Sequence, residues 1–293
     1  MQIALRDVTL YQAGFSSLRQ GLQDLGLTAV ELAVTRRLTL PAPEDSLGPG
    51  LPATTPEQQA EISRVYRAAG LTPCALFLAN NFNALDPAAE IAWGLATVRL
   101  AESLGVPVVR LDGAMSGPDH LTRRRRLALY GGAVTSLLEA TAGSSVALAI
   151  ENHGRQGNDL PWLESLLADL DPARVGLTLD PANLYWAGYP LAEVYEATER
   201  LAPRVRHVHV KNLCYPEAVR ETRRPLGWEY GCCVCPTPEG DLDYGRLVAI
   251  LAAAGYAGAL ALEEESLGKY PPAERPALLA RDVTYLQQAG GTV

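Results

Sequence analysis

The chain has 293 residues, of which 48% are hydrophobic and 20% are charged, and its formal net charge is −8. This composition is typical of a globular protein, and the acidic balance argues against a broad nucleic-acid-binding surface. The sequence contains no run of about 18 apolar residues that could span a membrane, and no basic segment followed by an apolar one that would mark a secretory signal. We therefore expect a cytoplasmic protein without nucleic-acid or membrane partners.

The cysteines are few and unevenly placed. Cys74 stands alone, and the other four are Cys214, Cys232, Cys233 and Cys235. An odd number of cysteines in a chain without a visible signal argues against a disulfide framework. A structural zinc site in the cluster is an alternative, but one Cys-x-x-Cys without a matching pair favours plain thiols.

Short apolar runs rich in β-forming residues alternate with segments of helical spacing along the chain. Strands are predicted at 3–8, 29–34, 74–80, 106–111, 146–150, 175–179, 205–210 and 258–263. Helices are predicted at about 17–25, 55–69, 87–104, 118–142, 160–170, 190–202, 243–254 and 276–288. Such alternation indicates parallel strands that are joined by helical crossovers.

Two architectures are compatible with this alternation, a closed barrel and an open doubly wound sheet. The open sheet usually announces a nucleotide site by a glycine-rich first turn, and residues 7–15 contain no G-x-G-x-x-G motif. The chain also shows no change of composition that would mark a linker. We therefore predict an α/β protein, a single (β/α)8 TIM barrel over residues 1–293, with its site at the carboxyl ends of the strands.

Four potential metal ligands stand at the carboxyl ends of four successive predicted strands. They are Glu151, Asp180, His209 and Glu263. In a closed barrel these strand ends converge across one mouth. Each residue alone could be a helix cap or a rim charge, but together they predict a site for one divalent ion. Three carboxylates and one imidazole suit Mn²⁺, Mg²⁺ or Co²⁺, and Zn²⁺ is not excluded.

Short motifs surround these ligands. They read IENHG at 150–154, LDPAN at 179–183, HVHVKN at 207–212, EGDLDY at 239–244 and GYAG at 255–258. With them the chain resembles, over nearly its whole length, the sugar phosphate isomerase/epimerase family, whose barrels are built like xylose isomerase. The resemblance implies that the matching Glu, Asp, His and Glu bind a divalent metal, and that the two glutamates also transfer protons.

The chain departs from two groups of related proteins. Ketose 3-epimerases place a histidine and an arginine where this chain has Asn183 and Tyr215, which argues against a free-ketose 3-epimerase. The multinuclear zinc endonucleases need many more histidines than the four present here, which argues against DNA repair.

The chemistry of such a site leads to an enediolate. A divalent ion on two adjacent sugar oxygens polarises the carbonyl, and glutamates on opposite sides exchange protons with the neighbouring carbons. We predict an isomerase or epimerase acting on a small carbohydrate, namely a sugar, a sugar phosphate or a related polyhydroxy keto compound. A metal-dependent dehydratase of a keto-inositol or similar polyol and a non-catalytic carbohydrate-binding barrel are the alternatives. The sequence leaves open whether the protein forms a homo-oligomer.

Further site residues are expected around the ligands. Lys211 lies in phase with His209 and is one of two lysines in the chain, so we expect it to contact the substrate or the enediolate during catalysis. His153, Asn183, Arg110 and His207 are candidates for substrate binding. For His207 the alternative is a buried histidine one layer deeper that supports the ligands.

Two weaker candidates and one loop complete the prediction. Glu31 and Asn80 also stand at strand ends. The connection over 213–238 is long and contains Arg220, Arg223 and Arg224, which could hold an anionic group of the substrate. A solvated loop is the alternative.

Overall fold

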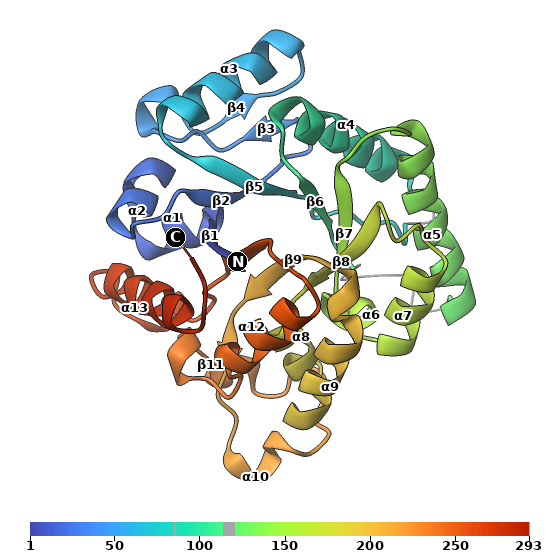
Figure 1. Cartoon of the computed structure of the whole chain (residues 1–293), viewed down its shortest axis with the longest axis vertical. Helices are drawn as coiled ribbons and strands as arrows, with labels where there is room; N and C mark the ends of the chain where they lie inside the picture. The colour runs from blue at the N-terminus through green and yellow to red at the C-terminus, as the bar shows by residue number, and fades with distance from the viewer. Residues whose placement is uncertain (85, 114–120, 293) are drawn as a thin grey trace.

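A closed barrel of parallel strands forms the centre of the computed structural model, which describes residues 1–84, 86–113 and 121–292. The strands follow one another around the barrel in the order β1, β12, β9, β8, β7, β6, β5 and β2 (Figure 1). They are β1 (Gln2–Arg6), β2 (Ala29–Ala33), β5 (Thr72–Phe77), β6 (Val108–Leu111), β7 (Ala147–Glu151), β8 (Val175–Leu179), β9 (Val205–Val210) and β12 (Ala259–Leu262). The predicted TIM barrel is therefore confirmed.

Helices surround the barrel (Figure 1). The longer ones are α2 (Leu18–Asp24), α3 (Pro56–Ala68), α4 (Ala88–Leu104), α5 (Arg123–Ala140), α7 (Leu160–Ala168), α9 (Leu191–Leu201), α12 (Tyr244–Ala253) and α13 (Arg275–Gln288). Local sequence sets their ends. Thr55 and Gln58 form a capping box at the start of α3, and Gly105 ends α4 in the left-handed region. The predicted start of α5 at residue 118 lies outside the described residues.

Several short elements connect the strands and helices at the two ends of the barrel. The helices among them are α1 (Asp7–Ala13), α6 (Gly154–Gly157), α8 (Pro181–Trp186), α10 (Glu217–Arg220) and α11 (Tyr230–Cys233), with 3-10 turns at Asp45–Leu47, Ala202–Arg204, Thr237–Glu239 and Leu267–Lys269. Two small ribbons pair β3 (Thr39–Leu40) with β4 (Leu51–Pro52) and β10 (Asn212–Leu213) with β11 (Val234–Cys235).

The first strand is shorter than predicted, because Asp7 and Val8 belong to α1. The Asp7 carboxylate accepts hydrogen bonds from the backbone N–H groups of Val8 and Ala33, at 2.6 and 2.9 Å, and so turns the chain at the strand end.

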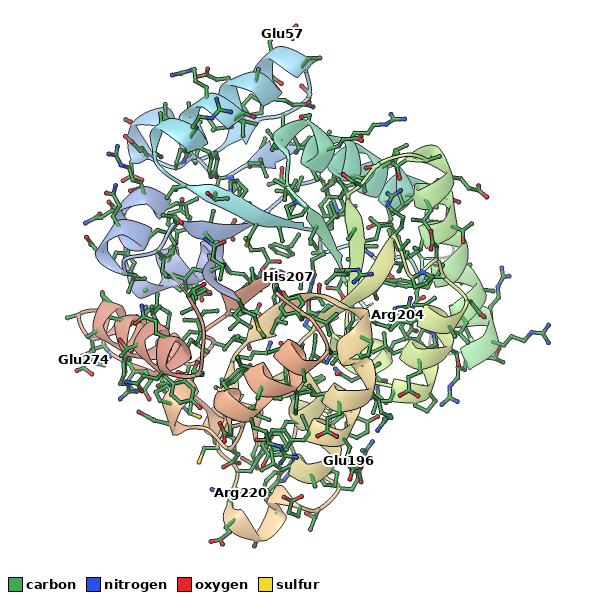
Figure 2. All side chains as sticks on the ribbon, viewed as in Figure 1. Glu57, Glu196, Arg204, His207, Arg220 and Glu274 are labelled. Atoms are coloured by element: carbon green, nitrogen blue, oxygen red, sulfur yellow. The ribbon has the colours of Figure 1, made fainter. Side chains whose placement is uncertain are left out.

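The buried hydrophobic side chains form one large core and two small clusters. The large apolar core includes residues of every long helix, whereas small residues such as Ala4, Ala29 and Ala261 form a separate buried cluster. Ala261 shares a strand face with Glu263, because side chains alternate along a strand. Figure 2 shows His207 near the middle of the barrel, while Glu57 lies on an outer helix. Small residues thus leave space inside the barrel for polar side chains.

All five cysteines are free thiols. Among the described helices, none combines the length and the apolar character that a membrane crossing requires.

Gly176 in β8 tests the packing between neighbouring strands. A Cβ added there would lie 2.2 Å from the carbonyl oxygen of Arg204, so we expect Gly176→Ala to lower the free energy of unfolding by about 1–3 kcal/mol. Gly132→Ala is the control, because a Cβ in the middle of α5 would meet nothing within 4 Å. It should raise the free energy of unfolding by about 0.5–1 kcal/mol. Denaturant titration measures both, and a stabilising Gly176→Ala would contradict the observed strand packing.

Candidate metal centre

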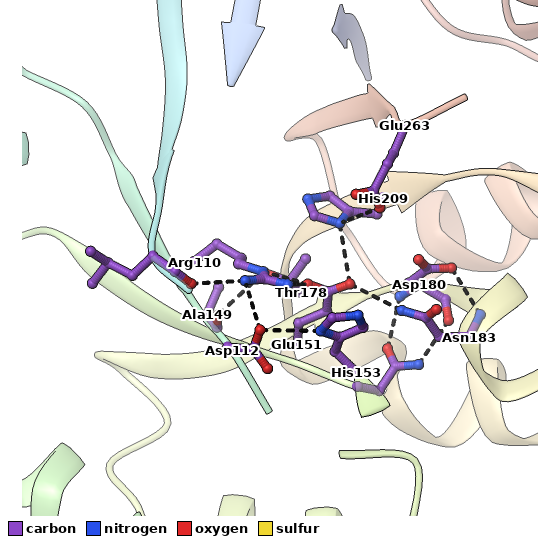
Figure 3. A network of polar contacts seen from close by, with 12 residues as sticks. Arg110, Asp112, Ala149, Glu151, His153, Thr178, Asp180, Asn183, His209 and Glu263 are labelled. Atoms are coloured by element: carbon purple, nitrogen blue, oxygen red, sulfur yellow. Dashed lines mark hydrogen bonds and ion pairs between the residues drawn. The ribbon is translucent and has the colours of Figure 1, made fainter. Parts of the chain in front are cut away.

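The four predicted metal ligands lie together at the carboxyl ends of β7, β8, β9 and β12. Their ligand atoms are all within 4.8 Å of one another, and all four residues are buried. Figure 3 shows Glu151, Asp180, His209 and Glu263 pointing toward one another from these strands. Oxygen-rich donors with one imidazole nitrogen could hold a divalent cation.

Local hydrogen bonds fix the position of Asp180. Its side chain caps α8 by accepting a hydrogen bond from the backbone N–H of Asn183 at 3.0 Å. The Asn152 side chain accepts from the Asp180 N–H at 2.8 Å and donates to the Asp180 carbonyl at 2.7 Å. The asparagines in the IENHG and LDPAN motifs therefore connect two neighbouring strand ends.

One buried oxygen in this group lacks a hydrogen-bond donor. Asp180 is fully buried, and its Oδ2 atom accepts no hydrogen bond. The Lys211 ammonium forms an ion pair with this oxygen at 3.1 Å. Burial raises the pKa of the Asp180 carboxyl. A buried carboxylate oxygen without a donor, surrounded by further ligand atoms, fits a site for a cation.

Each glutamate of the group divides its two oxygens between the centre and an arginine. Glu151 Oε1 is 3.3 Å from His209 Nδ1, while Oε2 pairs with Arg110. Glu263 Oε2 is 3.4 Å from His209 Nδ1, while Oε1 pairs with Arg6. Burial alone would raise the pKa of the Glu151 carboxyl, but Arg110 and His209 outweigh it and hold that pKa well below its usual range.

Glu31 orients the imidazole of His209. Its Oε2 lies 2.8 Å from His209 Nε2, so the other ring nitrogen, Nδ1, faces the centre. Burial would raise the pKa of Glu31, but His209 and His207 lower it well below the usual value. A carboxylate on the far nitrogen of a metal-binding histidine is the usual way to set its tautomer. The sequence had marked Glu31 only as a weaker candidate at a strand end, and its contact with His209 was not predicted.

His207 lies one layer below His209. Its Nε2 is 3.4 Å from Glu31 Oε1, its side chain is 1% exposed, and its ring meets that of His209 edge-on. Glu31, His207 and His209 form a second group of potential ligands that shares His209 with the first. The contact of His207 with Glu31 fits the predicted support of the ligands, and its predicted contact with the substrate stays a prediction.

A pocket of about 220 Å³ adjoins the centre. It is lined by His153, Asn183, Trp186, Lys211, Tyr230 and Glu265. Asn183 Nδ2 donates to Glu151 Oε1 at 3.0 Å, and Lys211 Nζ is 3.3 Å from Glu263 Oε2, so the pocket and the centre share contacts. His153 Nδ1 lies 3.2 Å from Asp112 Oδ2. Three of the predicted site residues therefore line this pocket.

Arg110 and Arg6 contact the two glutamates of the centre. Arg110 is buried, and besides Glu151 it contacts Asp112 at 3.5 Å and the carbonyl of Leu78 at 2.8 Å. Its predicted role in substrate binding therefore stays a prediction. Arg6, at the end of β1, was missed. Both guanidinium groups lie over the ring of Phe77.

The arginines of the 213–238 connection are engaged in local contacts. Arg220 Nε is 3.0 Å from Asp241 Oδ1, and Arg223 pairs with Glu193 at 3.6 Å. Arg224 is buried and donates to backbone carbonyls, including that of Tyr185 at 2.9 Å. These contacts hold the connection in place. The hypothesis that the three arginines hold an anionic group finds no support in this arrangement.

Other lining residues were not predicted either. Glu265 could have been predicted from the sequence. It follows Glu263 by two positions, and residues two apart in an extended chain point to the same side. Trp186 and Tyr230 gave no such signal, since they come from short helices that the sequence pattern did not reveal.

A family assignment agrees with this geometry. The sequence profile described as "Xylose isomerase-like TIM barrel" matches residues 20–289. The chain belongs to this family. The match covers all of the site described above except Arg6.

Solved structures of the same fold include proteins with different activities. The IolI protein with a bound zinc atom aligns with a TM-score of 0.73 and 15% identity over 99% of each chain. The probable 3-DHS dehydratase AsbF of Bacillus anthracis, involved in petrobactin synthesis, has a TM-score of 0.67 and 16% identity over 98% of this chain and 99% of its own. A D-tagatose 3-epimerase-like protein has a TM-score of 0.67 and 15% identity over 99% and 98%. At these identities the likeness shows the fold alone.

The contacts of the centre predict how variants change metal content. Purified protein should carry about one divalent ion per chain, and Asp180→Ala and His209→Ala should lose most of it, because each removes a ligand. Glu31→Gln should weaken binding by about 10–100-fold, because the His209 ring loses its orienting carboxylate. Elemental analysis and chelator competition measure both effects. Glu57→Gln on the outer face of α3 is the control, and full occupancy in both alanine variants would contradict the assignment.

Metal affinity should also depend on pH through His209. Burial lowers the pKa of this imidazole, but Glu31 and Glu151 outweigh burial and raise it to about 9 in the metal-free protein. An incoming ion must therefore displace a proton at neutral pH. Affinity should rise by about tenfold per pH unit from roughly pH 6 upward and level off near pH 9. Calorimetry in buffers of different ionisation enthalpy would count the released proton, and a flat profile would contradict this coupling.

Proposed function

We propose that this member of the xylose isomerase-like family is a divalent-metal-dependent isomerase or epimerase. Its substrate would be a sugar, a sugar phosphate or a related polyhydroxy keto compound that reacts through an enediolate. The observation that carries the proposal is the pair Glu151 and Glu263. They approach one centre from β7 and β12, which are separated around the barrel by β8 and β9.

The ion would be held by Glu151, Asp180, His209 and Glu263. Mn²⁺, Mg²⁺, Co²⁺ and Zn²⁺ are all compatible with these donors, and the IolI structure contains zinc in the same fold. When bound, the ion supplies Lewis-acid stabilisation of the negative charge that develops on neighbouring sugar oxygens.

The two glutamates would move the protons. Arg110 holds Glu151 Oε2 and Arg6 holds Glu263 Oε1, so Glu151 Oε1 and Glu263 Oε2 are the oxygens that face the centre. One would take a proton from a substrate carbon while the other returns it from the opposite side. Return to the same carbon gives the epimer, and return to the adjacent carbon gives the isomer.

Lys211, His153 and Asn183 would bind and orient the substrate. Burial lowers the pKa of the Lys211 ammonium, but Asp180 and Glu265 outweigh it and raise the pKa above its usual value. Lys211 is therefore a protonated donor that can hydrogen-bond a developing oxyanion. Asn183 and His153 line the same pocket and would contact hydroxyl groups.

A metal-dependent dehydratase is the second candidate. The observation in its favour is the pair His153–Asp112 beside the protonated Lys211, because such groups can protonate a hydroxyl that leaves from the enediolate. AsbF, a probable dehydratase, shares the fold. A non-catalytic carbohydrate-binding barrel is less favoured, since a binding protein needs no pair of buried glutamates at the centre.

A screen in D₂O tests the proposal and separates these candidates. Metal-loaded protein is incubated with ketoses, their phosphate esters and keto-inositols, and products are analysed by NMR and mass spectrometry. Solvent deuterium on carbon in recovered substrate and product supports the isomerase or epimerase. Loss of water supports the dehydratase, and the absence of both reactions would refute catalysis.

Conservative variants separate catalysis from metal binding. Glu151→Gln and Glu263→Gln keep an oxygen ligand but remove the basic carboxylate. We expect each to retain part of the metal and the fold and to lose turnover by a factor of about 10² or more. Metal content, circular dichroism and turnover are measured on the same samples. A metal-loaded double variant with normal turnover would show that the glutamates do not transfer the protons.

A further inference from the structure

Among the described residues that line the pocket there is one lysine, Lys211, and its positive charge is already compensated. Lys211 Nζ lies 2.8 Å from Glu265 Oε1, 3.1 Å from Asp180 Oδ2 and 3.3 Å from Glu263 Oε2. An ion bound to Asp180 and Glu263 would still leave Glu265 paired with Lys211. A divalent ion among three carboxylate ligands also leaves the centre with net negative charge.

The neighbouring arginines are compensated in the same way. Arg6 pairs with Glu263, and Arg110 pairs with Glu151 and Asp112. Arg6 keeps one buried N–H group, at Nε, without an acceptor, and a hydroxyl oxygen could serve it. Arg155 is exposed on α6, two positions after His153, and has no charge partner among the ion pairs of the described residues.

Glu265 neutralises Lys211 at the pocket, beside a centre of net negative charge. Its side chain is 34% exposed, and the Tyr230 hydroxyl donates to Oε2 while Lys211 donates to Oε1. The carboxylate is therefore held in position by two neighbours from different elements. A phosphate or carboxylate entering the pocket would have to compete with the Glu265 carboxylate for Lys211, and like charges brought together in an interface cost several kcal/mol.

The remaining walls suit an uncharged ring. Trp186 and Tyr230 contribute aromatic surface, and His153 and Asn183 contribute polar atoms. Pockets that bind small molecules are mostly apolar with a few placed polar groups. The volume of about 220 Å³ lies below the range of about 300–1,000 Å³ that is usual for drug-sized ligands. It fits one monosaccharide.

We propose that the substrate is an uncharged polyhydroxy carbonyl compound of monosaccharide size, and that Glu265, held by Tyr230, excludes phosphorylated and carboxylate-bearing analogues. This inference rests on the proposed function, because it concerns the same centre. In this proposal Glu265 is the residue that selects the substrate according to its charge.

Calorimetry on the metal-loaded protein tests the selection with matched ligands. The probes are D-fructose with D-fructose 6-phosphate, D-xylulose with D-xylulose 5-phosphate, and a keto-inositol. The free compound of each pair should bind at least about tenfold more tightly than its ester. Tighter binding of the esters would overturn the proposal, as would the absence of binding by every uncharged probe. If esters bind tightly and Arg155→Ala abolishes this, Arg155 and not the pocket selects the ligand, and the proposal is overturned.

Glu265→Gln tests the role assigned to that residue. The variant removes one negative charge and frees Lys211 from it, so the preference for the free sugar should fall by about tenfold. Glu199→Gln is the matched control, because Glu199 is 56% exposed and pairs with Arg246 at 3.9 Å on the surface. Tyr230→Phe keeps the charge of Glu265, so it should weaken binding of the free sugar without admitting esters. An unchanged preference in Glu265→Gln would overturn the assignment.

The two proposals fail in different ways. Deuterium exchange into a sugar phosphate, with no reaction of free sugars, would refute the charge selection and keep the isomerase or epimerase. Selective binding of free sugars without exchange or loss of water would refute the proposed catalysis and keep the charge selection.

Discussion

The structure depends on the compensation of carboxylates that are buried inside a closed barrel. An unpaired buried carboxylate is strongly destabilising, so each needs a cation or hydrogen-bond donors within contact distance. The chain supplies a different partner to each one. Glu31 contacts His209, Glu151 contacts Arg110, Asp180 contacts Lys211, and Glu263 contacts Arg6. The site is therefore an alternating network of charges and not an isolated set of ligands.

This network explains the composition of the barrel interior. Long charged side chains need space, and the strands provide it with small residues such as Ala4, Ala29 and Ala261. The apolar core lies instead between the strands and the surrounding helices. Polar groups can then fill the mouth and the layer below it, where His207 and Glu31 lie, without loss of the apolar packing that holds the barrel closed.

The same compensation bears on the chemistry. Arg110 holds the pKa of Glu151 well below its usual range, so this carboxylate is ionised and ready to bind a cation, but it is a weak base. Lys211 is held in its protonated form by neighbouring carboxylates. A base as weak as Glu151 suits removal of a proton from a carbon whose acidity a bound divalent ion would increase, rather than from an unactivated carbon.

The sequence by itself determined the barrel and the four candidate ligands that meet at its mouth, because both follow from local patterns. Apolar runs predicted the strands, and Glu151, Asp180, His209 and Glu263 followed as strand-end residues. Only the tertiary structure decided which other side chains meet them. Glu31 and His209 are 178 residues apart in the chain, and no local pattern reports such a contact. The partners of the arginines were likewise invisible, because an ion pair is set by barrel closure, which brings distant strand ends within a few ångströms of one another.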